Sequence, residues 1–267
     1  MSEPSPEVTA SVLLSWPEEI RVLRRFGLRD GIRVLDLGSG PAVAAAELLA
    51  RSPGTSVVGL EPETASFPRA REATAPHADR WALVRGTADR VPFRAGSFDF
   101  VLARLVFQHL RDPVAAAGEA LGVLRPGGRL AVTDVDRELS YALDPPLPEL
   151  DRLMARYDAW HRAGGGDRSV GGRLRAILVS AGAVEVQTET IRFESRPETA
   201  ERFLDVLAGP GRMRALREAG YVTQAEVDDF LAARARWLLS PGRAATRYLR
   251  MACGTAPAGA LRSASTP

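Results

Sequence analysis

Residues 32–45 read IRVLDLGSGPAVAA, an apolar run that contains one acid and continues into a turn with two glycines. The apolar run has the length of a buried strand, and the turn opens into a segment with helical spacing. Glycines allow the backbone to approach a ligand closely, and the first turn of a helix offers free N–H groups. The stretch therefore predicts a strand, a turn and a helix that together bind a nucleotide-like ligand.

Strand-length apolar runs recur along the first half of the chain and alternate with helix-like segments. Strands are expected at 32–37, 56–61, 81–86, 98–103 and 129–135. Helices are expected at 41–51, 62–74 and 113–124, the last one stopped by a tight turn at Pro126-Gly127-Gly128. Near-continuous apolar strands separated by helices indicate an α/β fold, a parallel Rossmann-like sheet with helices on both faces.

Composition and charge exclude several classes of protein. Of the 267 residues, 45% are hydrophobic and 25% charged, and the net charge is +2 with arginines interleaved among acids. We therefore expect no nucleic-acid partner, because a dense basic stripe is absent. No segment approaches the roughly 20 apolar residues that cross a membrane. One cysteine and three scattered histidines disfavour a metal site, and the absence of a signal-like segment favours a cytoplasmic protein.

Two acidic residues narrow the class of ligand. The dinucleotide fingerprint G-x-G-x-x-G would require glycine at position 43, where the chain has Val43. Asp36 lies two residues before Gly38, where a carboxylate disfavours a pyrophosphate and suits a cationic or amine-bearing ligand. Glu61 ends the second strand and can accept hydrogen bonds from both hydroxyls of a ribose. Glu61 fits NAD as well, so only Asp36 and Val43 distinguish the expected ligand from a dinucleotide.

Four stretches extend this pattern: VLDLGSGPA at 34–42, VVGLEPE at 57–63, GTADRVPFRAGSFDFVLA at 86–103 and LRPGGRLAVTD at 124–134. Together they resemble the class I S-adenosylmethionine-dependent methyltransferases, particularly the small-molecule enzymes related to the ubiquinone and menaquinone methyltransferases. The resemblance covers about residues 31–136 and is weaker toward the end of the chain. It implies S-adenosyl-L-methionine as the cofactor and a seven-stranded sheet whose last strand, expected at 245–253, is antiparallel.

The organisation of the chain follows from these segments. We interpret residues 1–256 as a single methyltransferase domain that begins with an N-terminal helical lid over 1–30 and a cofactor-binding core over 31–137. Helical cap insertions are expected at 138–170 and 197–240, on either side of a helix at 171–181 and a sixth strand at 184–193. The remaining residues 257–267 are expected to be disordered.

The resemblance also assigns residues to the cofactor by position. The expected cofactor-binding residues are Asp36, Gly38, Ser39, Gly40, Glu61, Pro62, Thr87, Ala88 and Arg104. Asp36 and the glycine backbone would face the methionine end and Glu61 the ribose, while Pro62, Thr87 and Ala88 would lie by the adenine. Arg104 has two interpretations, namely contact with the carboxylate of the cofactor or of an anionic substrate, and an ordinary structural ion pair.

Two positions depart from the family pattern. Thr87 replaces an aspartate that accepts from the adenine amino group, so that contact should be weaker, with Asp89 nearby as a substitute. Ala42 stands where the family often has glycine. We expect Ala42 to be the second residue of the helix, where a methyl group favours helicity.

The acceptor side offers one candidate base. His109 follows the fourth strand, and a histidine pKa lies near working pH; the alternative is that it caps or packs the following helix. The other candidate acceptor-binding residues are Tyr141, Tyr157, Trp160, His161 and Arg168. Core packing is the alternative for Tyr157 and Trp160, and an exposed loop position is the alternative for His161.

These observations predict an enzyme that transfers a methyl group from S-adenosylmethionine to a small, partly apolar metabolite. The arginine-rich composition associates the chain with bacterial secondary metabolism. Two alternatives stay open: an RNA methyltransferase, and a methyltransferase-like domain that binds the cofactor for a non-methylating role such as a cyclisation.

Overall fold

A computed structural model describes residues 6–258, and its first half forms the expected parallel strands. They are β1 (Arg33–Leu37), β2 (Ser56–Glu61), β3 (Trp81–Arg85), β4 (Phe98–Arg104) and β5 (Leu124–Asp134). Three later strands, β6 (Tyr141–Asp144), β7 (Val184–Glu194) and β8 (Ala244–Thr255), join the same sheet. The order is β3-β2-β1-β4-β5-β8-β6, and β7 also pairs with β8. The first five strands are mutually parallel, and β8 is antiparallel to β5, β6 and β7.

The described sheet has eight strands, one more than expected, because β6 lies inside the segment 138–170 that was predicted to be helical. Its four residues carry no strand signal of their own. They become a strand by pairing with β8, where Tyr141 lies opposite Arg247 and Asp144 opposite Ala244. The helix expected at 113–124 ends at Gly122, before Pro126-Gly127-Gly128. β5 already begins at Leu124, so the expected turn lies inside this strand, as a jump in register between Leu124 and Arg129 with Gly127 at a φ of 74°.

Helices cover both faces of this sheet, as the sequence predicted. One face carries α1 (Pro6–Arg25), α2 (Val43–Arg51) and α3 (Phe67–Thr74), and the other carries α4 (Pro113–Gly122) and α6 (Leu174–Ser180). The period-2 alternation of buried strands separates two hydrophobic cores. Val34 faces the first group of helices and Leu35 the second.

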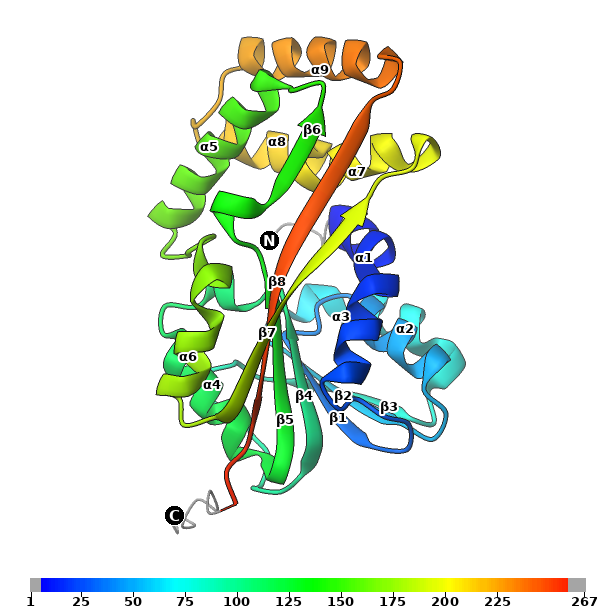
Figure 1. Ribbon diagram of the computed structural model, residues 1–267, viewed down its shortest axis with the longest axis vertical. Coiled ribbons are helices and arrows are strands. Elements are labelled where there is room, and N and C mark those ends of the chain that lie inside the picture. Colours follow the sequence, from blue (N-terminus) through cyan, green and yellow to red (C-terminus); the bar gives the residue numbers. More distant parts are fainter. Residues whose placement is uncertain (1–5, 259–267) are drawn as a thin grey trace.

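A cap stands beyond the carboxyl ends of the parallel strands (Figure 1). It is built from α5 (Pro148–Ala163), α7 (Ala200–Ala208), α8 (Pro210–Glu218) and α9 (Gln224–Leu239), with β6 and the adjacent ends of β7 and β8. The hydrophobic core on the α1 side of the sheet continues into this cap. β8 belongs to both halves, because it pairs with β5 over 250–255 and with β6 over 244–247.

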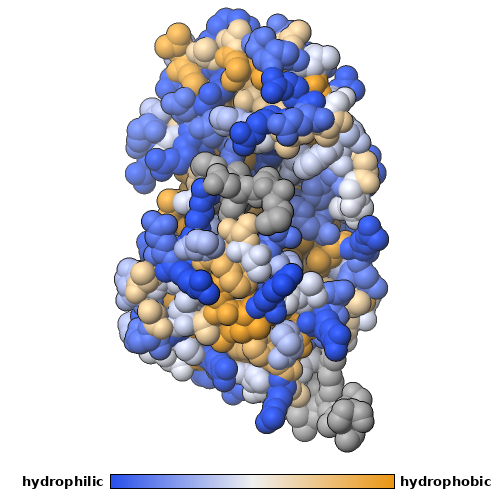
Figure 2. Space-filling model, turned by 180° about the vertical axis from the view of Figure 1, so that it is seen from behind, coloured by the Kyte–Doolittle hydropathy of each residue, from blue (hydrophilic) through white to orange (hydrophobic). Residues whose placement is uncertain are grey.

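Two surface features complete the description. Hydrophilic side chains cover most of the face opposite to that of Figure 1, and hydrophobic ones gather in its lower, sheet-bearing half (Figure 2). Within residues 6–258, no helix combines the length and hydropathy needed to cross a bilayer. Residues 1–5 of the predicted lid and 259–267 of the predicted tail lie outside the described residues.

Candidate active site

The turn after β1 is shaped by three residues with positive φ, namely Gly38 (72°), Gly40 (51°) and Ala42 (55°). A Cβ on Gly38 would lie 2.5 Å from Cγ2 of Val106, so only glycine fits there. Ala42 is the residue before α2 rather than its second residue, so that expectation is wrong. The chain needs a left-handed residue to enter the helix, and the Ala42 N–H closes the turn on the Ser39 carbonyl at 2.8 Å. Alanine in this conformation costs about 1–2 kcal/mol, which the turn tolerates.

Asp36 is buried beneath this turn, and its Oδ2 has no hydrogen-bond partner in the described part of the chain. Burial raises the pKa of Asp36 to about 7, and repulsion from Glu61 adds to this, while Arg104 opposes it. The hydroxyl of Ser39 is also buried without a partner among residues 6–258. Buried polar atoms of this kind are costly unless a ligand pairs with them. The turn therefore fits a ligand with a positive charge or amino group.

Glu61 connects the turn to the end of β2. Its Oε2 accepts from the Gly40 N–H at 2.8 Å, and its Oε1 accepts from the Glu63 N–H at 2.9 Å. Each carboxylate oxygen keeps a further lone pair that can accept from a ribose hydroxyl. The ribose contact stays a prediction. Glu61 has a second role that its sequence position did not reveal, since its bond to Gly40 holds the shape of the glycine turn.

The predicted adenine-side residues follow β2 and β3. The Gly86 N–H donates to the Glu61 carbonyl at 3.3 Å, which places the segment with Thr87 and Ala88 next to the end of β2. Thr87 and Pro62 are exposed, whereas Ala88 is buried. Contact of these residues with adenine stays a prediction.

Arg104, at the end of β4, is buried in an ion pair. Its Nε lies 3.0 Å from both carboxylate oxygens of Glu19, and its Nη2 donates to the Ser15 hydroxyl at 2.9 Å. Both acceptors belong to α1, so the pair fixes this helix against the sheet. The structural ion pair is thus present, and a contact with the cofactor stays a prediction.

Two histidines meet at the boundary of core and cap. His109 ends a short 3-10 turn after β4, and its Nδ1 lies 3.1 Å from Nε2 of His161 near the end of α5. His161 is buried in a helix, rather than exposed in a loop. His109 is exposed at its outer edge, yet desolvation by its neighbours lowers its pKa to about 4, together with repulsion from His161, Arg168 and Arg212. The pKa of His161 is also lowered to about 4, by burial and then by the same two arginines. Both rings are therefore neutral at pH 7.

Asp134, which the sequence reasoning missed, positions the turn that carries His109. It is fully buried at the end of β5, and its Oδ2 accepts from the Gln108 N–H at 3.0 Å. Its Oδ1 accepts from the Val135 N–H at 2.8 Å. Burial raises the pKa of Asp134 to about 7 against the effect of these hydrogen bonds. The sequence did offer a signal for Asp134, since an acidic residue at the end of an apolar strand is the pattern that identified Asp36.

The glycine loop after α5 packs on the histidine pair. A Cβ on Gly166 would lie 2.2 Å from Cε1 of His161 and 2.7 Å from the Gln108 carbonyl. The neighbouring Asp167 N–H donates to that same carbonyl at 2.8 Å. The loop therefore holds His161 against the turn that carries His109.

The predicted acceptor-side residues gather around Tyr157, which is buried. The guanidinium carbons of Arg168 and Arg212 lie 4.5 and 4.2 Å from the centre of its ring. The rings of Trp160 and His161 lie 5.7 and 5.9 Å from it. Tyr141 is the exception, since its hydroxyl donates to Asp151 at 2.6 Å. Arg212 was not singled out in the sequence, because α8 lies far from this segment in the chain.

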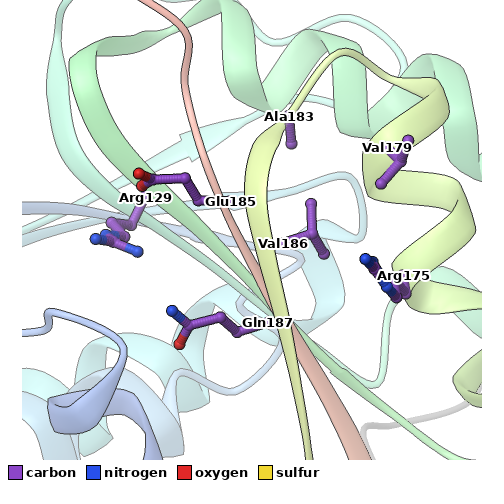
Figure 3. A pocket seen from close by; sticks show the side chains of 7 residues that line it. All are labelled: Arg129, Arg175, Val179, Ala183, Glu185, Val186 and Gln187. Atoms are coloured by element: carbon purple, nitrogen blue, oxygen red, sulfur yellow. The ribbon is translucent and has the colours of Figure 1, made fainter.

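An open hollow beside β7 lies away from these residues. It has a volume of about 650 Å³ and is lined by Arg129, Arg175, Val179, Ala183, Glu185, Val186 and Gln187. Figure 3 shows Arg129, Glu185 and Gln187 on one side of β7 and Arg175, Val179 and Val186 on the other. These side chains do not converge on a common point, so the hollow is not a second candidate site.

Comparisons with known proteins agree on one class of protein. The family described as "Methyltransferase domain" matches residues 35–132. A trans-aconitate 2-methyltransferase of Methylobacterium radiotolerans is 30% identical over 199 residues, which are 71% of this chain and 72% of that protein. A demethylmenaquinone methyltransferase of Beutenbergia cavernae is 36% identical over 135 residues, 51% of either protein. A solved structure of Haemonchus contortus phosphoethanolamine N-methyltransferase 2 with S-adenosylhomocysteine has a TM-score of 0.58 at 19% identity, covering 91% of this chain and 53% of that one.

The chain belongs to the class I S-adenosylmethionine-dependent methyltransferases. S-adenosylmethionine is the cofactor of this family, and the turn fits it: the unpartnered Asp36 carboxylate suits its positive charge, and Glu61 has lone pairs for its ribose. The chain spans about half the length of the demethylmenaquinone methyltransferase that it matches. Among residues 6–258, no three side chains of His, Cys, Asp or Glu gather as a metal site.

Proposed function

We propose that this protein transfers a methyl group from S-adenosylmethionine to a small, partly apolar molecule, in bacterial secondary metabolism. The observation that carries the proposal is the buried Asp36 carboxylate, which has an unpartnered oxygen at a turn held by Glu61. When bound, S-adenosylmethionine supplies an electrophilic methyl group on a sulfonium. The protein then has to hold and align the two reactants and exclude water.

A small acceptor is favoured by the cap. Four helices stand over the carboxyl ends of the strands, and a small molecule fits beneath such a cover better than a polymer does (Figure 1). The names of the trans-aconitate and demethylmenaquinone relatives also denote small acceptors.

His109 is the proposed general base, and His161 the residue that orients it. When the His109 Nδ1–H donates to Nε2 of His161, Nε2 of His109 keeps a free lone pair for a proton of the acceptor. A pKa of about 4 leaves that lone pair unprotonated at neutral pH but makes it a weak base, so it suits an acceptor whose proton is already acidic. A base is needed only where the acceptor loses a proton to become nucleophilic.

Thermal unfolding tests the cofactor and the role of Glu61. We expect S-adenosylmethionine and S-adenosylhomocysteine to raise the melting temperature and NAD to leave it unchanged. Exchange Glu61→Ala should remove most of the shift, whereas Glu63→Ala, which keeps the backbone N–H bonded to Glu61, should preserve it. A response to NAD alone would overturn the proposal.

Two further measurements separate the alternatives. Methyl transfer to candidate metabolites, followed as a 14 Da mass gain, is the expected result. A tight, steeply salt-dependent affinity for RNA would favour an RNA methyltransferase instead. Conversion of a candidate without mass gain would favour a cyclisation.

A further inference from the structure

Arg247 is a buried arginine without a counter-ion. It lies on the part of β8 that enters the cap and is 6% exposed. Its Nε and Nη1 have no hydrogen-bond partner anywhere in residues 6–258. An unpaired buried charge is costly, and the N–H groups of a buried arginine normally donate to carboxylates or carbonyls. The Arg247 guanidinium therefore lacks a hydrogen-bond acceptor, and residues 6–258 do not supply one.

The immediate surroundings of Arg247 are apolar or aromatic. Tyr141 on β6 and Phe193 on β7 lie opposite it in the two antiparallel pairings, so their side chains share its face of the sheet. Along β8, the neighbours on that face are the buried Ala245 and Leu249. None of these four side chains has a carboxylate that could pair with Arg247.

The charged groups that act on Arg247 are mostly positive. Its pKa is lowered to about 9, first by burial and then by repulsion from Arg104, Arg212 and Arg168, while Glu19 alone opposes this. Glu19 is already paired with Arg104. Two of these arginines have partners of their own, since Arg168 lies 2.7 Å from Asp158 and Arg212 donates to the carbonyls of Val206 and Leu207. Arg247 is the member of the group left without one.

Arg168 and Arg212 lie over the Tyr157 ring, at 4.5 and 4.2 Å from its centre, and the His161 ring lies 5.9 Å from the same centre. An anion beside Arg247 would therefore lie on the acceptor side of the site. The cofactor turn is farther away in the sheet: β4 and β5 separate β1 from β8, a distance of three strand spacings or roughly 14 Å.

We infer that the methyl acceptor carries a carboxylate, which Arg247 binds inside the cap while Tyr141 and Phe193 contact the apolar body of the molecule. This inference rests on the proposed function and names its substrate class. A monoanion on an apolar body matches one unpaired guanidinium in apolar surroundings, and the fork of the guanidinium binds both carboxylate oxygens.

The test compares carboxylates with their neutral amides. We expect benzoate and trans-cinnamate to raise the melting temperature of the protein with S-adenosylhomocysteine by about 3 °C or more at saturation, and benzamide and cinnamamide to have no effect. Arg247→Met should abolish this shift and keep the shift caused by S-adenosylhomocysteine itself. It should also leave the unliganded protein as stable as the wild type or more stable, because it removes an unpaired buried charge. Arg247→Lys should retain part of the carboxylate shift.

Arg192→Met is the matched control, because Arg192 lies on the neighbouring strand β7 and is exposed. It should retain both shifts. The inference is overturned if the carboxylates cause no shift in the wild type, if inorganic phosphate alone does, or if Arg247→Met keeps the carboxylate shift. Loss of the S-adenosylhomocysteine shift in Arg247→Met would assign Arg247 to the cofactor, which overturns the inference and leaves the proposed function intact. If S-adenosylhomocysteine does not raise the melting temperature of the wild type, the proposed function itself is refuted.

Discussion

Arg104 on β4 and Glu19 on α1 form an ion pair at 3.0 Å in which both side chains are almost completely buried. Removing one member of such a pair leaves an uncompensated buried charge. We expect Glu19→Ala to lower the free energy of unfolding by about 3–5 kcal/mol, measured by urea denaturation. Replacing both members by methionine should recover much of the loss.

Glu18→Ala is the control for this experiment, since Glu18 pairs with Arg21 at the surface of the same helix. Its effect should stay below about 1 kcal/mol. Equal effects of the two single exchanges would contradict the role assigned to the buried pair.

Asp36 should make stability depend on pH. Its pKa in the folded protein is raised to about 7, above the value of about 3.9 for an unfolded chain. Between these values the folded state binds more protons, so the contribution of Asp36 is fully present below pH 4 and is lost as the pH rises to about 7. The difference in unfolding free energy between wild type and Asp36→Asn should therefore fall over this range. Parallel curves for the two proteins would show that Asp36 ionises normally.

His109 should titrate far below an ordinary histidine. Its pKa of about 4 results from burial first and then from His161, Arg168 and Arg212. Arg212→Met removes one positive charge and should raise the pKa of His109, whereas Arg214→Met, an exposed position on the same helix, should not. NMR titration of the histidine ring protons, assigned with His109→Gln, measures both values. A wild-type pKa near 6.5 would show that burial and the neighbouring charges do not lower the pKa of His109.

Gly166 should not tolerate a side chain. A Cβ there would meet the His161 ring at 2.2 Å and the Gln108 backbone at 2.7 Å, so Gly166→Ala has to displace one of them. We expect a loss of about 1–3 kcal/mol in unfolding free energy and a changed His161 ring resonance. Gly164→Ala, where the nearest atom lies at 3.4 Å, is the matched control and should change little. Equal unfolding free energies of the two variants would mean that the loop does not hold His161 in place.

The parts of the fold predicted correctly are those with a local signal. The strands of the parallel sheet are apolar runs of strand length, so their positions follow from the residues themselves. β6 was missed because its pairing partner lies about a hundred residues away. Ala42 was misplaced because the left-handed turn is imposed by the geometry between strand and helix.

In the candidate site too, the residues that were predicted are those with a local signal in the sequence. Asp36 and Glu61 were found from their places at strand ends, whereas the partners of Arg104 and His109 lie 85 and 52 residues away in sequence. No spacing rule connects such residues. Their contacts arise only when α1 packs on the sheet and α5 takes its place in the cap, and the unpaired charge of Arg247 is visible only once its neighbours are known.

The continuity of β8 limits how the protein can open. One unbroken strand is hydrogen-bonded to β5 over 250–255 and to β6 over 244–247, so core and cap are not joined by a flexible linker. A hinge rotation of the cap as a rigid flap would break the ladder between β7 and β8, which runs without interruption through both halves from Thr246 to Cys253. Entry and exit of ligands must instead use bending of the strand ribbon or displacement of single segments at its margin.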